Sequence, residues 1–204
     1  MITNRLTEII PDQTIIIYDT EFTTWEGAMA RGWSGPHEHR ELVQIAAQKV
    51  DLKQGVVVDS FERLVRPRIN TVLSDYFIDL TGITNEDVTE SGVDFLEAYQ
   101  DLMAWAADIS LYSYSCTLAG STDADVLAEN INLYQLPISL PYERFHLLTP
   151  VFIAAGIDTT LYNSGKLYQA FGLDLAGHEH NAMFDVTSLV ASLFAAAARL
   201  KNGG

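Results

Sequence analysis

The chain has 204 residues, of which 48% are hydrophobic and 10% are aromatic. This length and composition can bury the core of one domain, so we expect a single domain over residues 1–204 and exclude a disordered chain. The formal net charge is −15, and no Lys or Arg occurs between Ile69 and Glu143. Because such a surface repels polyanions at long range, broad electrostatic binding of duplex nucleic acid is excluded.

The cysteine content and the apolar runs bear on the cellular compartment. Cys116 is the sole cysteine, which excludes an internal disulfide and a site built from several cysteines, and we expect a cytoplasmic protein. The first residues, MITNRLTEIIPDQ, lack the continuous apolar core of a signal peptide. The longest apolar run, Leu189 to Leu200, is too short to cross a bilayer, so we expect no membrane partner.

The first half of the chain predicts successive strands and then helices. Runs rich in β-branched residues predict strands at residues 14–19, 42–51 and 56–65. Apolar residues spaced three and four apart then predict helices at residues 74–80, from a capping-type start at Thr84, and at 93–107.

The second half of the chain alternates strands and helices. The pattern predicts strands at residues 109–115 and 144–147, and helices at 122–134, 150–155, 164–171 and 181–200. Consecutive strands followed by alternating elements are typical of one mixed sheet covered by helices. We therefore expect an α/β fold with a central mixed sheet of about five strands flanked by helices.

Two acids stand at the end of the first predicted strand, in Tyr18-Asp19-Thr20-Glu21. Residues two apart on a strand point to the same face, so the two carboxylates would lie side by side and repel each other. A hard divalent cation with oxygen ligands, Mg²⁺ or Mn²⁺, would relieve this repulsion. The alternative is a strand that simply ends in a polar loop.

Further acids occur in two later segments. Asp123 and Asp125 lie just after the fourth predicted strand and open a helix, where Asp is also favoured by the helix dipole alone. If the first and fourth strands are parallel neighbours, this helix begins at the sheet edge where Asp19 lies. In the segment His180-Asn181-Ala182-Met183-Phe184-Asp185, a histidine precedes an alanine by two residues and an aspartate by five.

The three motifs together, Asp-x-Glu, a later Asp at a helix start, and His-x-Ala-x-x-Asp, resemble those of the DEDDh 3′-5′ exonucleases, also called DnaQ-like or ribonuclease T-like. The resemblance runs from about Thr14 to Leu193 and is nearest to the branch of the enhanced-RNAi and histone-mRNA exonucleases and KapD. That branch is indicated by Val65-Arg66-Pro67, Leu80-Thr81-Gly82-Ile83-Thr84 and Gly165-Lys166-Leu167.

One segment departs from the family pattern. The family usually has Trp-Gly before the second motif, where this chain has Leu118-Ala119-Gly120. The departure leaves a choice between Asp123 and Asp125. We select Asp123, three residues after Gly120 as in that branch, with Asp125 as the alternative.

The resemblance implies a ribonuclease H-like exonuclease fold in a single exonuclease domain. It implies removal of nucleoside 5′-monophosphates from the 3′ ends of single-stranded nucleic acid, with RNA favoured. Two divalent cations, Mg²⁺ or Mn²⁺, would be held by Asp19, Glu21, Asp123 and Asp185, and His180 would take the proton from the attacking water. The remaining histidines are expected to be solvated loop residues: His37, His39, His146 and His178.

The residues just after Asp-x-Glu contact the terminal nucleotide in this family, which makes Phe22, Thr23 and Trp25 candidate substrate-binding residues. Core packing is the alternative for Phe22. The glycine-rich segment Ala28 to Glu41, which carries Arg31, Trp33 and Arg40, is a candidate lid. The short basic cluster Arg63, Arg66 and Arg68 is either a local nucleic-acid contact or a solvated strand edge.

Two other functions stay open at this stage. One is a DNA exonuclease or an exonuclease of mixed specificity with the same chemistry, because no residue selects the sugar. The other is a catalytically silent nucleic-acid-binding or regulatory module, which would most simply have lost one of the five site residues, and none is missing. The sequence identifies no protein partner.

Overall fold

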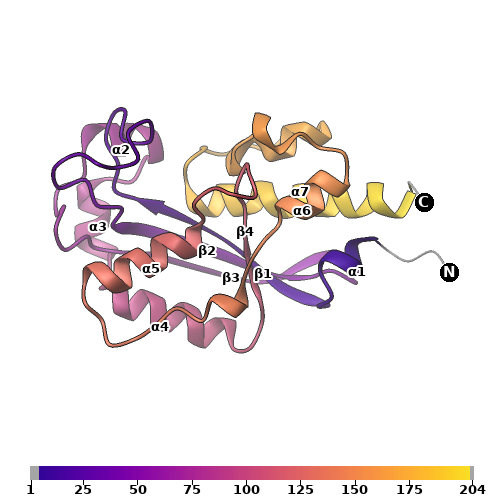
Figure 1. Ribbon diagram of the computed structural model, residues 1–204, viewed down its shortest axis with the longest axis horizontal. Coiled ribbons are helices and arrows are strands. Elements are labelled where there is room, and N and C mark those ends of the chain that lie inside the picture. The colour runs from indigo at the N-terminus through magenta and orange to yellow at the C-terminus, as the bar shows by residue number, and fades with distance from the viewer. Residues whose placement is uncertain (1–4, 203–204) are drawn as a thin grey trace.

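The centre of the protein is a sheet of five strands, seen in a computed structural model that describes residues 5–202 (Figure 1). The strands are β1 (Thr14–Phe22), β2 (Leu42–Asp51), β3 (Val56–Leu64), β4 (Leu111–Ser113) and β5 (Phe145–Leu147). Their order is β3-β2-β1-β4-β5, with antiparallel pairing from β3 to β1 and parallel pairing from β1 to β5. The expected mixed five-stranded sheet is confirmed, and β1 is its central strand.

Helices cover both faces of this sheet. The α-helices are α1 (Arg5–Ile9), α2 (Asp75–Thr81), α3 (Asn85–Ser91), α4 (Phe95–Ala106), α5 (Asp123–Leu133), α6 (Thr149–Ala154) and α7 (Ala182–Asn202). Short 3₁₀ helices are η1 (Tyr142–Arg144), η2 (Thr159–Leu161) and η3 (Ser164–Phe171). In Figure 1, α6 and α7 lie on one side of the sheet, and α4 and α5 lie on the other.

Alternation along β1 divides the core into two layers. Ile15 and Ile17 belong to the hydrophobic cluster that contains the buried residues of α6 and α7. Ile16 and Tyr18 belong to the cluster that contains those of α4 and α5. Because side chains alternate along a strand, Asp19 lies on the same face as Ile17, the face covered by α7. The residues that follow alternate between the two faces.

The predicted strands all occur within the described residues, with shifted ends. β1 continues to Phe22 because its pairing with β2 extends to Leu42, past a register shift between Glu21 and Phe22. The segment 164–171 forms a 3₁₀ helix, and the short helix α1 has no counterpart in the sequence prediction. Five residues of α1 are too few to show a helical period.

Helix α7 has the length and composition of a membrane-spanning helix, although the apolar run evident in the sequence covers only residues 189–200. The segment Ala182–Lys201 has a mean hydropathy of 1.4. The buried share of its most apolar 18-residue stretch is 56%. The fully buried positions include Val186, Leu189 and Leu193, which recur at three- and four-residue spacing and pack against β1 and β2. A core helix of this kind meets the same length and composition test.

A buried carboxylate at the start of β2 holds three parts of the fold together. The Glu41 side chain is 0% exposed and accepts hydrogen bonds from the backbone N–H groups of residues 68–70 at 2.6–2.8 Å. It also accepts one from the hydroxyl of Tyr134, at 2.6 Å. Because Tyr134 ends helix α5, Glu41 links the segment after β3 to the helix that carries Asp123.

We expect Glu41→Leu to lower the free energy of unfolding by about 3 kcal/mol, because three backbone N–H groups and a tyrosine hydroxyl lose their acceptor. The matched control is Tyr134→Phe, which removes one donor and should cost about 1 kcal/mol. Urea denaturation monitored by circular dichroism measures both changes. Equal losses in the two variants would contradict the bridging role of Glu41.

Candidate active site

The acids of the first motif lie at the C-terminal end of β1, in the floor of a cleft of about 460 Å³. Asp19 is 6% exposed and Glu21 is 9% exposed. Both lie on the α7 side of the strand, because they are two residues apart. Burial of two neighbouring carboxylates opposes folding unless a cation balances them.

The fourth acid comes from the first turn of α7. Asp185 is 2% exposed. Its Oδ2 accepts a hydrogen bond from Ser164 Oγ at 2.7 Å, and its Oδ1 accepts one from the His180 backbone N–H at 3.3 Å. Gly165 makes this approach possible, since a Cβ there would lie 2.5 Å from Asp185 Oδ1. The start of α7 is fixed to the sheet by a hydrogen bond from Ala182 N–H to Gln44 Oε1, 2.9 Å long.

The third acid, Asp123, is held against β1 by Thr20. Its Oδ1 accepts hydrogen bonds from the Thr20 backbone N–H at 3.1 Å and from the Thr20 hydroxyl at 2.6 Å. The expected parallel pairing of β1 with β4 is present and brings the start of α5 to this edge. Asp125 instead caps α5, where its Oδ2 accepts from the Thr122 N–H at 2.8 Å. Asp123 lines the cleft and Asp125 does not.

The four carboxylates interact unfavourably with one another. Burial, followed by the charges of Asp123 and Asp185, raises the pKa of Asp19 well above its usual value. Burial, followed by the charge of Asp185, does the same to the pKa of Glu21. Burial raises the pKa of Asp123 and of Asp185 to about 6. In their ionised forms, these four carboxylates therefore lack a compensating positive charge among the described residues.

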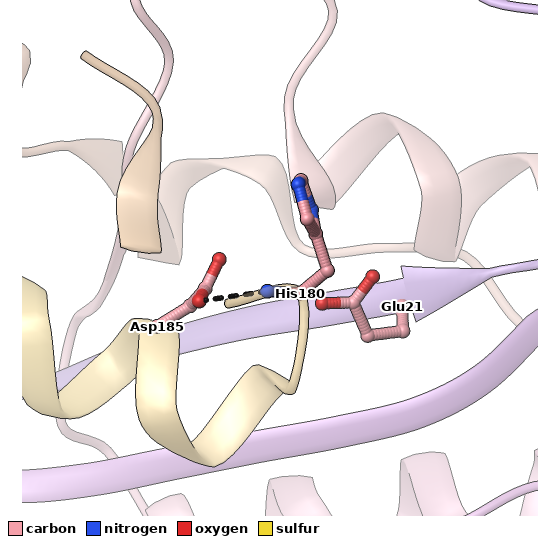
Figure 2. A group of neighbouring side chains, drawn as sticks. All are labelled: Glu21, His180 and Asp185. Atoms are coloured by element: carbon pink, nitrogen blue, oxygen red, sulfur yellow. Dashed lines mark hydrogen bonds between the residues drawn. The ribbon is translucent and has the colours of Figure 1, made fainter. Parts of the chain in front are cut away.

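The donor set of this cleft fits hard divalent cations. Within residues 5–202, none of the four carboxylates forms an ion pair with Lys or Arg. Glu21, His180 and Asp185 each place one ligand atom within 4.8 Å of the others (Figure 2). Carboxylate oxygens are the preferred ligands of Mg²⁺ and Mn²⁺. A divalent cation would replace repulsion by attraction among these residues.

His180 lies at the rim of the same cleft. Its backbone has a φ of 61°, a conformation rare outside glycine. The side chain is half-buried, and Figure 2 shows the ring extending away from β1. Burial lowers the pKa of His180, which favours the neutral imidazole that can accept a proton. His178 is exposed and does not line the cleft.

The three candidate substrate-binding residues differ in position. Phe22 lines the cleft and packs edge-on against Trp33, with ring centroids 5.5 Å apart. Thr23 is buried, and its hydroxyl donates to the His39 carbonyl at 2.6 Å, which orders the loop before β2. Trp25 is half-buried and lies outside the residues that line the cleft.

The short basic cluster lies away from the cleft and is largely neutralised. Arg63 pairs with Asp101 at 3.0 Å, and Arg68 pairs with Asp94 at 2.7 Å. Both acids belong to the α4 region, where the sequence has many acids and no base. Neither arginine lines the acidic cleft.

Sequence reasoning missed the neutral residues that orient the acids. Thr20 orients Asp123, Ser164 orients Asp185, and Gln44 anchors the start of α7. The only signal for Thr20 was its place between the two acids of the first motif. Ser164 and Gln44 are distant in sequence from the acids they support, so no spacing indicates them.

Comparisons with known proteins agree with this arrangement. A family model described as "Exonuclease" (RNase_T) matches residues 16–193. The chain is 26% identical over 194 residues to the human protein named ERI1 exoribonuclease 2, covering 84% of this chain but 26% of that protein. It is 32% identical over 112 residues to human 3′-5′ exoribonuclease 1, covering 53% of this chain and 30% of that one. The chain thus spans less than a third of these relatives.

A solved structure shows the same fold. The nuclease domain of 3′hExo, described as a DEDDh family member bound to rAMP, superimposes with a TM-score of 0.73 at 20% identity. The match covers 94% of this chain and 93% of that domain. The expected ribonuclease H-like exonuclease fold is therefore confirmed.

We expect Asp19→Asn to raise the melting temperature in EDTA, because it removes one charge from a buried group of like charges. Added Mn²⁺ should stabilise the wild type by several degrees and the variant much less, since a ligand that binds only the folded state stabilises it. Differential scanning fluorimetry measures both effects. The control is Asp174→Asn, an exposed acid outside the cleft, and the metal-site interpretation is wrong if Asp19→Asn and this control respond alike to Mn²⁺.

Proposed function

We propose, from the premise that this chain belongs to the exonuclease family, that it removes nucleoside 5′-monophosphates from the 3′ ends of single-stranded nucleic acid. The reaction would require two divalent cations, Mg²⁺ or Mn²⁺. The observation that carries the proposal is the convergence of Asp19, Glu21, Asp123 and Asp185 with His180 in one cleft. This set retains every residue that the family's chemistry needs.

Asp19, Glu21, Asp123 and Asp185 would hold the cations. When bound, the two cations would stabilise the charge that develops on the scissile phosphate and on the leaving oxygen. Thr20 and Ser164 each donate a hydrogen bond to one acid and fix its orientation without adding positive charge. These carboxylates therefore stay available to bind a cation.

His180 would accept the proton of the attacking water. Its lowered pKa supports the neutral form near pH 7, which a general base requires. The hydrogen bond from its backbone to Asp185 fixes the base relative to one acid of the site. The ring itself stays free to face the water and the substrate.

RNA is the substrate class that we favour. The support is the names of the two human relatives, both exoribonucleases. A DNA exonuclease or one of mixed specificity is the second candidate, because no described contact identifies a 2′-hydroxyl. The complete set of acids and His180 argues against a catalytically silent nucleic-acid-binding module.

We further propose a single exonuclease domain that works in the cytoplasm without a membrane partner. The support is the shared core on both faces of one sheet, the single cysteine, and the packing of α7 as a core helix. A protein partner that supplies positive surface is compatible with the net charge of −15.

The direct test uses purified protein, Mn²⁺, and 5′-labelled single-stranded RNA and DNA of the same sequence. We expect products that shorten one nucleotide at a time from the 3′ end, with RNA the faster substrate and no reaction in EDTA. A parallel 3′-labelled strand should release the labelled mononucleotide at once. Products of internal cleavage, or degradation from the 5′ end, would contradict the proposal.

The two histidines of His178-Glu179-His180 offer a matched pair for the base assignment. We expect His180→Ala to lower kcat by roughly 10²–10⁴-fold, the usual contribution of a positioned general base. Binding of substrate should change little, because the imidazole acts on the proton. His178→Ala is the control and should stay near the wild-type rate in single-turnover assays. A larger defect in His178→Ala would reverse the assignment.

A further inference from the structure

A second cavity of about 650 Å³ lies beside the active cleft, between the loop before β2 and helix α5. Its lining includes Trp33 and Arg40 from the loop and Glu129 from the helix. Arg40 and Ser121 line both this cavity and the active cleft. The two spaces therefore meet at these two residues, and the functions assigned so far use only the cleft.

Arg40 occupies the junction of the two cavities. Its guanidinium lies 5.5 Å from the centroid of the Phe22 ring and 5.4 Å from that of Trp33. Its Nε donates to Glu129 Oε2 at 2.8 Å, and its Nη1 donates to Ser121 Oγ at 3.0 Å. Among the described residues that line the acidic cleft, Arg40 alone carries a permanent positive charge.

Trp33 presents an aromatic ring to the second cavity. Its φ is 50°, a strained conformation for a bulky side chain that persists only where surrounding contacts impose it. Those contacts are the edge-on packing with Phe22 and the stacking under Arg40. These contacts thus hold a large aromatic ring beside the one permanent cation among the described residues of the cleft.

We propose that this second cavity binds the unpaired base of the nucleotide on the 5′ side of the one being removed. Trp33 would stack on that base, and Arg40 would contact the phosphate that links the two nucleotides. The inference rests on the proposed exonuclease function and names the substrate of the same site: a strand of at least two nucleotides with an unpaired end.

The chemistry of the lining favours this ligand. An aromatic ring with an adjacent guanidinium is the combination that binds single-stranded nucleic acid without regard to sequence, by stacking and by contact with the backbone. A base inside a duplex is already stacked on both neighbours, so the cavity would favour an unpaired base. The volume lies within the usual range of about 300–1,000 Å³ for small-molecule sites.

The pairing of Arg40 with Glu129 is suited to exchange. The Glu129 side chain is 48% exposed and the Arg40 side chain is 13% exposed, so the carboxylate of the pair is open to solvent while the guanidinium is largely covered. Because water already competes for the exposed carboxylate, a phosphate entering the junction could take over donors of Arg40. Glu129 would then act as a competitor of the substrate for the same guanidinium.

The first experiment compares a trinucleotide with the p-nitrophenyl ester of a nucleoside 5′-monophosphate, which has no second base. We expect Trp33→Leu to lower the ratio of kcat/KM for the trinucleotide to kcat/KM for the ester by about tenfold. Trp33→Phe should restore most of this ratio, because it retains a ring for stacking. The control is Trp105→Leu, a half-buried tryptophan of α4 outside both cavities, with the ratio kept within about twofold.

A ratio that stays at the wild-type value in Trp33→Leu would overturn the inference. A drop in Trp25→Leu with none in Trp33→Leu would overturn it as well and would support the sequence-based choice of Trp25. A binding measurement separates the role of Trp33 in substrate binding from its effect on hydrolysis. We therefore also measure fluorescence anisotropy of a labelled trinucleotide with Ca²⁺, where Trp33→Leu should weaken binding about tenfold. If the wild type hydrolyses neither substrate yet shows this Trp33-dependent binding, the proposed activity fails and the binding site stands.

The second experiment uses the two members of the ion pair. We expect Arg40→Gln to raise KM for the trinucleotide by about tenfold, because a charged donor to the phosphate is lost. Glu129→Gln should lower the same KM by about threefold, because Arg40 loses its competing carboxylate. If the pair served only to hold the loop in place, both substitutions would raise KM, and that outcome would overturn the role of Arg40.

Discussion

The main physical constraint on this structure is the repulsion among four carboxylates that converge in one cleft. Asp19 and Glu21 come from a central strand, and Asp123 and Asp185 come from the first turns of two helices on opposite sides of the sheet. Without a cation, such a group of acids can be held together only by rigid secondary-structure elements that pack in large hydrophobic cores. Each of these acids lies in, or at the start of, an element of this kind. The supporting partners are hydroxyls and backbone N–H groups, which orient the oxygens and leave the charge available to a metal.

Glu41 provides the contrast that separates a structural acid from the acids of the site. The Glu41 side chain is buried, yet its oxygens accept hydrogen bonds from three backbone N–H groups and from a tyrosine hydroxyl. Hydrogen bonds to the charged form stabilise a buried carboxylate within the folded chain. Asp19 receives no comparable set, and burial, followed by the charges of its neighbours, raises its pKa. Burial alone therefore does not identify a metal ligand, whereas burial without sufficient donors does indicate one.

The distribution of positive charge follows from the same constraint. A lysine or arginine paired with a site acid would compete with the cations, and the four arginines that form ion pairs within residues 5–202 pair with acids elsewhere. Arg40 approaches the cleft but is bound to Glu129 and covered by two aromatic rings. With a net charge of −15, this chain has little long-range attraction for nucleic acid. Under the proposed function, recognition of a strand would then depend on short-range contacts near its end, such as stacking and a single guanidinium.

The sequence by itself determined the elements and the catalytic motifs, because both depend on short spacings. Strand periodicity placed Asp19 and Glu21 on one face, and the helical stretch predicted from Thr122 marked the start of α5. Several features were decided only by the tertiary structure: that Asp123 rather than Asp125 faces the cleft, that β1 continues past Glu21, and that Thr23 orders a loop. It also brought Ser164 to Asp185 and Arg40 to Trp33, across distances in the chain that no local pattern records. The physical reason is that hydrogen-bond partners and stacked rings are selected by packing between elements, whereas a periodic pattern describes one element at a time.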